Sequence, residues 1–144
     1  MSNICKKAVT VQDVLRRYDI ISKYTDFLIE NVVDEYADIA VEKTKEYIEN
    51  YPKKEELKNC KTYEEALHYL IENGDEELKK IAVDYYKEWI YDYVDEFCEQ
   101  NDLSDEDKSL IKKTNPNNFI GSKIVLSSYC QYYVEDYLYE IPLN

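Results

Sequence analysis

The chain contains one histidine, His68, which lies three residues after Glu65. Glu-x-x-His units bind iron in carboxylate-bridged four-helix proteins, but such a site needs two of these units together with further inward-facing glutamates. A single histidine cannot supply the second unit. We therefore expect His68 to be an ordinary residue of an amphipathic helix.

Four cysteines, Cys5, Cys60, Cys98 and Cys130, are far apart in the sequence, and no two of them form a C-x-x-C pair. Zinc sites and disulfide frameworks usually show such local spacing. We expect free thiols, most of them buried, with no bound metal and no cofactor. A metal site in which folding brings Cys60 and His68 together with another cysteine is the alternative.

Motifs for other chemistry are incomplete. The segment that begins at Asp102 resembles a calcium loop, but it lacks the central glycine and has Lys113 where a bidentate glutamate is needed. The chain has no G-x-S-x-G motif and no glycine-rich phosphate loop. The sequence therefore predicts a binding protein and not an enzyme.

Acidic residues are the dominant polar feature. The net charge is −13, and it is concentrated: residues 26–42 contain six acids and no base, and residues 88–107 contain nine acids and no base. A protein that binds nucleic acid directly needs lysine and arginine to neutralise phosphates. The predicted partner is therefore a basic, nucleic-acid-binding protein, and not nucleic acid itself.

The acids fall into two rows with near-helical spacing. The first acidic row is Asp26, Glu30, Asp34, Asp38 and Glu42. The second acidic row is Asp84, Glu88, Asp92, Asp95 and Glu99, which a continuous helix would hold within an arc of about 80°. Like charges one helical turn apart destabilise a helix by about 0.2–0.5 kcal/mol per pair. That cost favours a functional reason for the rows.

Helices are expected throughout, because the chain has only two glycines and three prolines and its apolar residues recur at three- and four-residue steps. We predict an all-α, single-domain bundle of residues 1–144 with five to six helices, two or three of them long. The predicted helices are 10–51 with a break near Ser22–Thr25, 52–59, 63–73, 76–100, a short one from Ser104, and 118–140. Capping signals are expected at Thr10, Thr62, Asp75 and Ser104.

The periodicity also predicts which side chains face inward. In the first helix they are Val11, Val14, Leu15, Tyr18, Ile21, Leu28, Val32, Tyr36, Ile39 and Ile48. In the last helix they are Leu126, Cys130, Tyr133, Val134, Tyr137 and Ile141. A second strip on the last helix, Val125, Tyr129, Tyr132 and Tyr139, needs cover from another helix, a second subunit or a partner.

Size, charge, helicity, the 16 tyrosines and the carboxylate spacing along 26–42 and 84–99 together resemble a class of small acidic proteins. These are the anti-CRISPR and anti-restriction DNA mimics of phages and mobile elements. The resemblance implies a stoichiometric inhibitor that occupies the nucleic-acid site of a CRISPR effector nuclease or a restriction enzyme. An immunity protein or antitoxin against a nuclease toxin is one alternative, and a helical scaffold or dimerisation module is another.

The expected contacts with the partner are the ten residues of the two acidic rows and five aromatic anchors, Phe27, Tyr91, Tyr129, Tyr132 and Tyr139. No apolar run approaches the roughly 20 residues that span a bilayer. We expect a cytoplasmic protein, monomeric or homodimeric, without a membrane partner.

Overall fold

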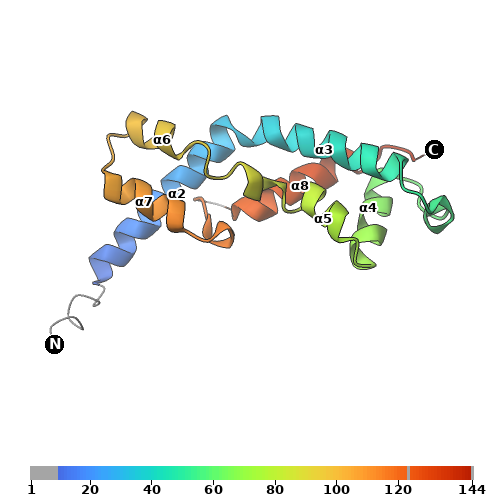
Figure 1. Ribbon diagram of the computed structural model, residues 1–144, viewed down its shortest axis with the longest axis horizontal. Helices are drawn as coiled ribbons and strands as arrows, with labels where there is room; N and C mark the ends of the chain where they lie inside the picture. Colours follow the sequence, from blue (N-terminus) through green and yellow to red (C-terminus); the bar gives the residue numbers. More distant parts are fainter. Residues whose placement is uncertain (1–9, 123, 144) are drawn as a thin grey trace.

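The computed structural model describes residues 10–122 and 124–143, and within these ranges the fold is all-α, as expected (Figure 1). Seven α-helices are present in the described residues, more than the five to six predicted. They are α2 (Val11–Asn31), α3 (Val33–Glu49), α4 (Tyr63–Glu72), α5 (Glu76–Ala82), α6 (Val94–Gln100), α7 (Asp105–Lys113) and α8 (Leu126–Leu138). Three short 3-10 helices, Lys54–Leu57 (η1), Tyr85–Glu88 (η2) and Pro116–Asn118 (η3), lie between them.

Side chains cap the helices at the predicted positions. Thr10 and Asp13 form a reciprocal capping box on α2, and Ser104 and Asp107 form another on α7. Thr62 and Asp75 accept backbone hydrogen bonds at the starts of α4 and α5. Gly74 follows α4 with a φ of 84°, a conformation that favours glycine. These four helix starts are confirmed.

The first long helix breaks at Val32, and the break predicted near Ser22–Thr25 is wrong. Val32 has a φ of −127° and separates α2 from α3. Asn31 donates a side-chain hydrogen bond to the Phe27 carbonyl, and such bonds compete with the helical backbone ladder. Val32 and Val33 are both buried, and their branched side chains disfavour helix. The chain bends here so that both valines reach the core.

The predicted helix 76–100 is also interrupted, over residues 83–93. The buried Tyr24 hydroxyl donates to the Ile90 carbonyl at 2.7 Å, while the Val94 amide donates to Tyr91 and not to Ile90. Trp89 and Ile90, which lie in this interrupted stretch, are both buried in the cluster that contains Tyr24. This interruption explains the additional helix and alters the geometry of the second acidic row.

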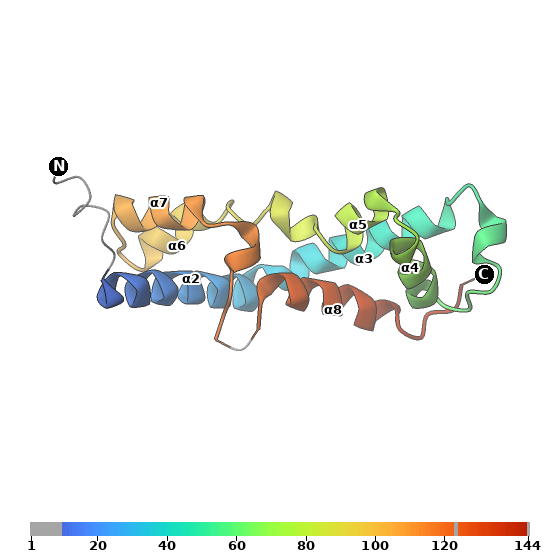
Figure 2. The ribbon, with the colours of Figure 1, turned by 90° about the horizontal axis from the view of Figure 1, so that it is seen from below.

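The helices form an elongated assembly with α2 and α3 running nearly end to end (Figures 1 and 2). One buried cluster lies between α2, α6, α7 and the start of α8, and contains Tyr24, Trp89 and Phe119. The other lies between α3, α4, α5 and the end of α8, and contains Ile48, Leu70 and Leu138. The helix α3 reaches both clusters, so its outer face extends along the middle of the molecule.

Several predicted inward positions are exposed. Val11, Val14, Leu15 and Tyr18 at the start of α2 are exposed, as are Ile39 on α3 and Tyr137 on α8. Ile21, Leu28, Val32 and Ile48 are buried as predicted. The periodicity locates an apolar face correctly, but the other helices do not extend far enough to cover its first turns.

The last helix begins at Leu126, eight residues later than predicted, because Phe119 and the loop after η3 fill the core before α8 starts. Across the described ranges, no helix combines the length and the apolar character needed to cross a membrane.

Candidate partner-binding surface

The first acidic row lies along the outer side of α2 and α3. Asp34, Asp38 and Glu42 are on α3, Glu30 is on the last turn of α2, and these four side chains are exposed. Successive carboxylates on α3 are therefore about 6 Å apart along the helix axis, since each residue rises by about 1.5 Å. The bend at Val32 separates Glu30 from the other three but leaves the row on the surface.

None of the five acids of this row has an ion pair with lysine or arginine among the residues that the structure describes. The two lysines of α3 face elsewhere. The Lys43 ammonium lies 5.1 Å from the ring centroid of Tyr85, and that of Lys45 lies 5.8 Å from the ring of Tyr63. The negative charge of the row is therefore not neutralised from within α3.

Two members of the row have hydrogen-bonding roles inside the protein. Asp26 is only partly exposed, and its Oδ1 accepts from the Ser122 amide at 2.9 Å beside the tightly packed Gly121. Asp38 accepts from the Tyr133 hydroxyl at 2.7 Å. Asp26 thus holds the loop before α8 against α2. Asp38 stays at the surface and positions a tyrosine of the neighbouring helix.

The second acidic row is not a continuous stripe, because the helix that was predicted to carry it is interrupted. Asp84 pairs with Lys87 at 3.5 Å. Asp95 pairs with Lys108 and Lys112 of α7, each at 3.4 Å, and these lysines hold the pKa of Asp95 below its usual value. Glu88, Asp92 and Glu99 are exposed and have no ion pair in the described part of the chain. This row is partly neutralised from within.

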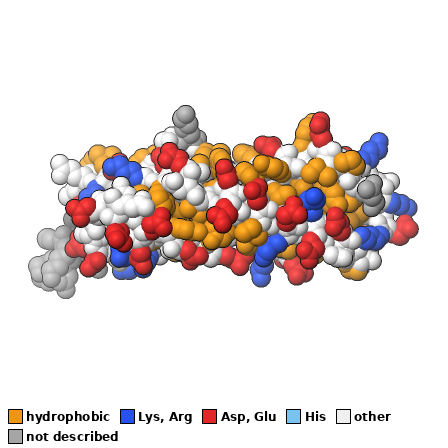
Figure 3. All heavy atoms as spheres, turned by 90° about the horizontal axis from the view of Figure 1, so that it is seen from above, with side chains coloured by type: hydrophobic (Ala, Val, Ile, Leu, Met, Phe, Trp, Pro, Cys, Tyr) orange, Lys and Arg blue, Asp and Glu red, His pale blue; other side chains and the backbone are white. Residues whose placement is uncertain are grey.

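Acidic residues of the segments 26–42 and 88–107 lie near each other beside the hydrogen-bonded pair Tyr36 and Tyr93. The Tyr93 hydroxyl donates to the Tyr36 hydroxyl at 2.7 Å, and the Tyr36 ring stacks on Trp89 with centroids 5.0 Å apart. Burial, the bond to Tyr36 and the nearby carboxylates of Glu35 and Asp92 raise the pKa of Tyr93. Figure 3 shows the face formed largely by α3 and α6, where acidic side chains lie between hydrophobic ones and outnumber basic side chains.

Two of the five aromatic residues that were predicted to contact a partner pack against the core instead. The Phe27 ring packs against Phe97 with centroids 5.3 Å apart, and it is only partly exposed. The Tyr91 hydroxyl donates to the Thr114 carbonyl, and its ring meets Phe119 edge to face. Tyr129 is half-buried against the core, whereas Tyr132 and Tyr139 are exposed. Only the last two are free to contact a partner with most of the ring.

Sequence reasoning missed the tyrosines that border the first acidic row. Tyr133 was predicted to face the core and does pack against both buried clusters while half-buried, whereas Tyr137, also predicted to face inward, is exposed; their rings stack with centroids 4.7 Å apart. Burial and the hydrogen-bonding neighbours Tyr137 and Asp38 raise the pKa of Tyr133. The spacing of Tyr129, Tyr133 and Tyr137, four residues apart, was the available signal. We call Asp34, Asp38, Glu42, Tyr133 and Tyr137 the α3–α8 surface.

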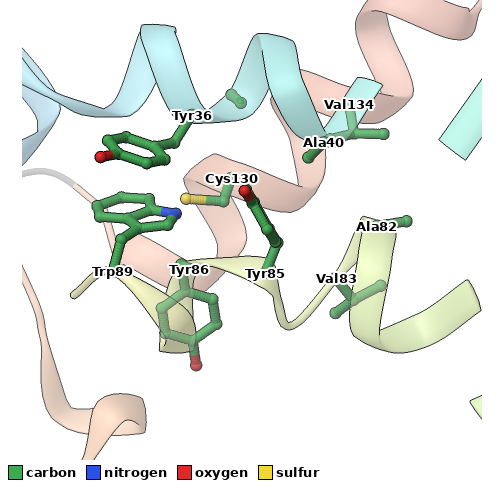
Figure 4. Close-up of a pocket in the computed structure, with 10 residues that line it drawn as sticks. Tyr36, Ala40, Ala82, Val83, Tyr85, Tyr86, Trp89, Cys130 and Val134 are labelled. Atoms are coloured by element: carbon green, nitrogen blue, oxygen red, sulfur yellow. The ribbon is translucent and has the colours of Figure 1, made fainter. Parts of the chain in front are cut away.

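The described residues also line a small, partly open pocket of about 10 Å³ between α3, α5, η2 and α8 (Figure 4). Trp89, Tyr86 and Cys130 are among its lining residues, and the indole nitrogen faces the Cys130 sulfur. Trp89 Nε1 is buried and has no hydrogen-bond acceptor among the described residues. A space of this size holds about one water molecule. A pocket of this size is too small for a substrate.

Three cysteines can be placed, and all are free: Cys98 and Cys130 are buried, and Cys60 is half-buried. Cys5 lies outside the described residues. His68 is 3.5 Å from Glu135 and 3.9 Å from Glu64. In the described ranges, no group of three or more His, Cys, Asp or Glu side chains is arranged to hold a metal ion.

We expect the buried thiols to resist alkylation in the folded protein. Burial raises the pKa of Cys130 to about 12 and also raises that of Cys98, whereas the reactive species is the thiolate. Peptide mass spectrometry after a short native iodoacetamide pulse at about pH 8 should show no label at either residue, and unfolding in urea should expose both. Half-buried Cys60 is the internal comparison and should be labelled before them. Rapid native labelling of Cys130 would contradict this packing.

Comparison with protein-family models, curated proteins and solved structures found no match to this chain.

Proposed function

We propose that the protein is a stoichiometric inhibitor of a nucleic-acid-processing enzyme, either a CRISPR effector nuclease or a restriction enzyme, and that it acts in the cytoplasm. In this proposal the α3–α8 surface occupies the enzyme's nucleic-acid site. The protein performs no chemistry of its own. The observation that carries the proposal is the row of exposed carboxylates on α3 without a lysine or arginine partner among the described residues.

The spacing of these charges supports the proposal. A DNA strand carries one phosphate per about 3.4 Å of helix axis, and the α3 row carries one carboxylate per roughly 6 Å. Glu35 and Glu46 are further exposed acids on α3 and raise the local charge density. A cleft lined by lysine and arginine to attract DNA would attract this surface by the same long-range field.

The bordering tyrosines support a protein partner with arginines. Arginine guanidinium groups both bind carboxylates through two parallel hydrogen bonds and stack on aromatic rings. The exposed Tyr137 ring lies beside Tyr133, whose hydroxyl is bonded to Asp38, so carboxylate and ring are available side by side. Tyrosine and arginine are also enriched among the residues that dominate protein interfaces.

The test starts from tagged protein used as bait in a lysate of a nuclease-bearing host. The captured enzyme is then purified and assayed with increasing amounts of the inhibitor. We expect activity to end near equimolar inhibitor, and the affinity to fall steeply between about 50 and 200 mM salt, as for a charged nucleic-acid site. Binding that does not depend on salt, or binding without inhibition, would contradict the proposal and favour a scaffold.

A further inference from the structure

The first turns of α2 present an apolar face that no other described element covers. Val11, Val14, Leu15 and Tyr18 are 75%, 54%, 61% and 57% exposed. At about 100° per residue they fall within an arc of roughly 100° on one side of the helix. We call these four residues the α2 stripe. Contiguous exposed apolar surface of this kind marks an interaction site more often than isolated apolar residues do.

The packing of α7 explains why the stripe is free. Arg16 forms an ion pair with the buried Asp107 of α7, and it lies roughly 150° around the helix from the centre of the stripe at about 100° per residue. The helix α7 therefore holds the opposite side of α2. Figure 1 shows the first turns of α2, in dark blue, projecting past α6 and α7 at one end of the molecule. Among the described residues, the exposure of the four side chains leaves the stripe accessible to a second helix.

The charge around the stripe distinguishes it from the rest of the surface. Residues 10–23 contain three bases and two acids, all outside the arc of the stripe, and Arg16 and Lys23 are paired with Asp107 and Asp19, so the chain's acidic excess does not extend onto the stripe. Two copies that each carry a net charge of −13 repel each other over most of their surfaces. At the α2 stripe they can meet with locally balanced charge and bury apolar side chains.

We infer that the α2 stripe is a dimerisation surface on which a second copy of this chain packs its own α2 stripe. A twofold axis through the contact makes the two sides identical, as in most homodimers. Leu15 and Asp34 are 19 positions apart along α2 and α3, roughly 28 Å at the helical rise, so the contact leaves the α3–α8 surface open. The inference does not depend on the function proposed above.

Size-exclusion chromatography with light scattering on the full chain tests this inference. We expect the wild type to show twice the 17.2 kDa chain mass at high protein concentration, and the dimer to strengthen as added salt screens the repulsion between the two acidic copies. The variant V11Q/L15Q should be monomeric at the same concentration. Both substitutions are at exposed positions and introduce no charge, so circular dichroism should show an unchanged helical signal.

The matched control is Y132Q/Y139Q, which removes two exposed aromatic side chains from the region of α8 and should remain dimeric. A wild-type monomer would overturn the inference and would leave residues 1–9 or another protein as the cover of the stripe. Dissociation by the α8 control but not by V11Q/L15Q would also overturn it, because the dimer would then form through α8. Neither result would affect the salt-dependent inhibition assay.

Discussion

Replacing Asp34 and Glu42 with lysine is expected to weaken binding to the captured enzyme by about 100-fold or more. Close charge pairs at desolvated interfaces are worth about 1.5 kcal/mol or more each, and each 1.4 kcal/mol is a factor of about ten in affinity. The two positions leave the Asp38–Tyr133 hydrogen bond in place. Isothermal titration calorimetry and the association rate should both show the loss, since reversed charges repel the basic site.

The matched control is E55K/E72K, which changes the net charge by the same amount at two exposed positions outside the α3–α8 surface. It should bind within a few-fold of the wild type. Circular dichroism should show that both variants are folded, with a small cost at Asp34, which lies in the first turn of α3. Equal losses in the two variants would mean that total charge matters and not the row, which would contradict the proposed site.

The largest effect on stability is expected for Phe119→Ala. Phe119 is fully buried, and its ring centroid lies 5.7 Å from that of Tyr91 and 5.9 Å from that of Tyr24. Its backbone carbonyl accepts a hydrogen bond from the Leu126 amide. Removal of such a ring lowers the free energy of unfolding by about 3–5 kcal/mol, a large share of a typical total of about 5–15 kcal/mol. Urea denaturation followed by circular dichroism should show a correspondingly lower midpoint.

Ile120→Ala is the control for this prediction, because the neighbouring side chain is 40% exposed and removes less buried surface. We expect a change of about 1 kcal/mol or less. If the two variants lost equal stability, Phe119 would not hold the start of α8 against α2 and α6, and the position of Tyr133 beside α3 would lack its support.

Local signals in the sequence predicted the local features correctly. The caps at Thr10, Thr62, Asp75 and Ser104 involve residues three positions apart, and Gly74 ends α4 through its own backbone conformation. Each of these depends on interactions within one or two turns, which a short stretch of sequence contains. The all-α class follows from the same short-range periodicity.

Contacts between residues far apart in the sequence determined the features that the sequence analysis did not predict. The interruption at 83–93 is linked to the bond from Tyr24 to Ile90, 66 positions away. The pairing of Asp95 with Lys108 and Lys112 depends on how α6 packs on α7. The same is true of Tyr137, whose exposure depends on how far the other helices extend. Four of the five residues of the first acidic row are exposed as predicted, because the helical segments that carry them exist. The second row is not continuous, because the helix predicted to carry it is interrupted.

Competition with DNA tests the central claim most directly. The captured enzyme would be titrated with labelled inhibitor at rising concentrations of unlabelled duplex DNA that contains its target site. If the α3–α8 surface occupies the nucleic-acid site, the apparent Kd for the inhibitor should rise in proportion to the DNA concentration, and no ternary complex should form. A stable complex of enzyme, DNA and inhibitor with an unchanged Kd would contradict the claim.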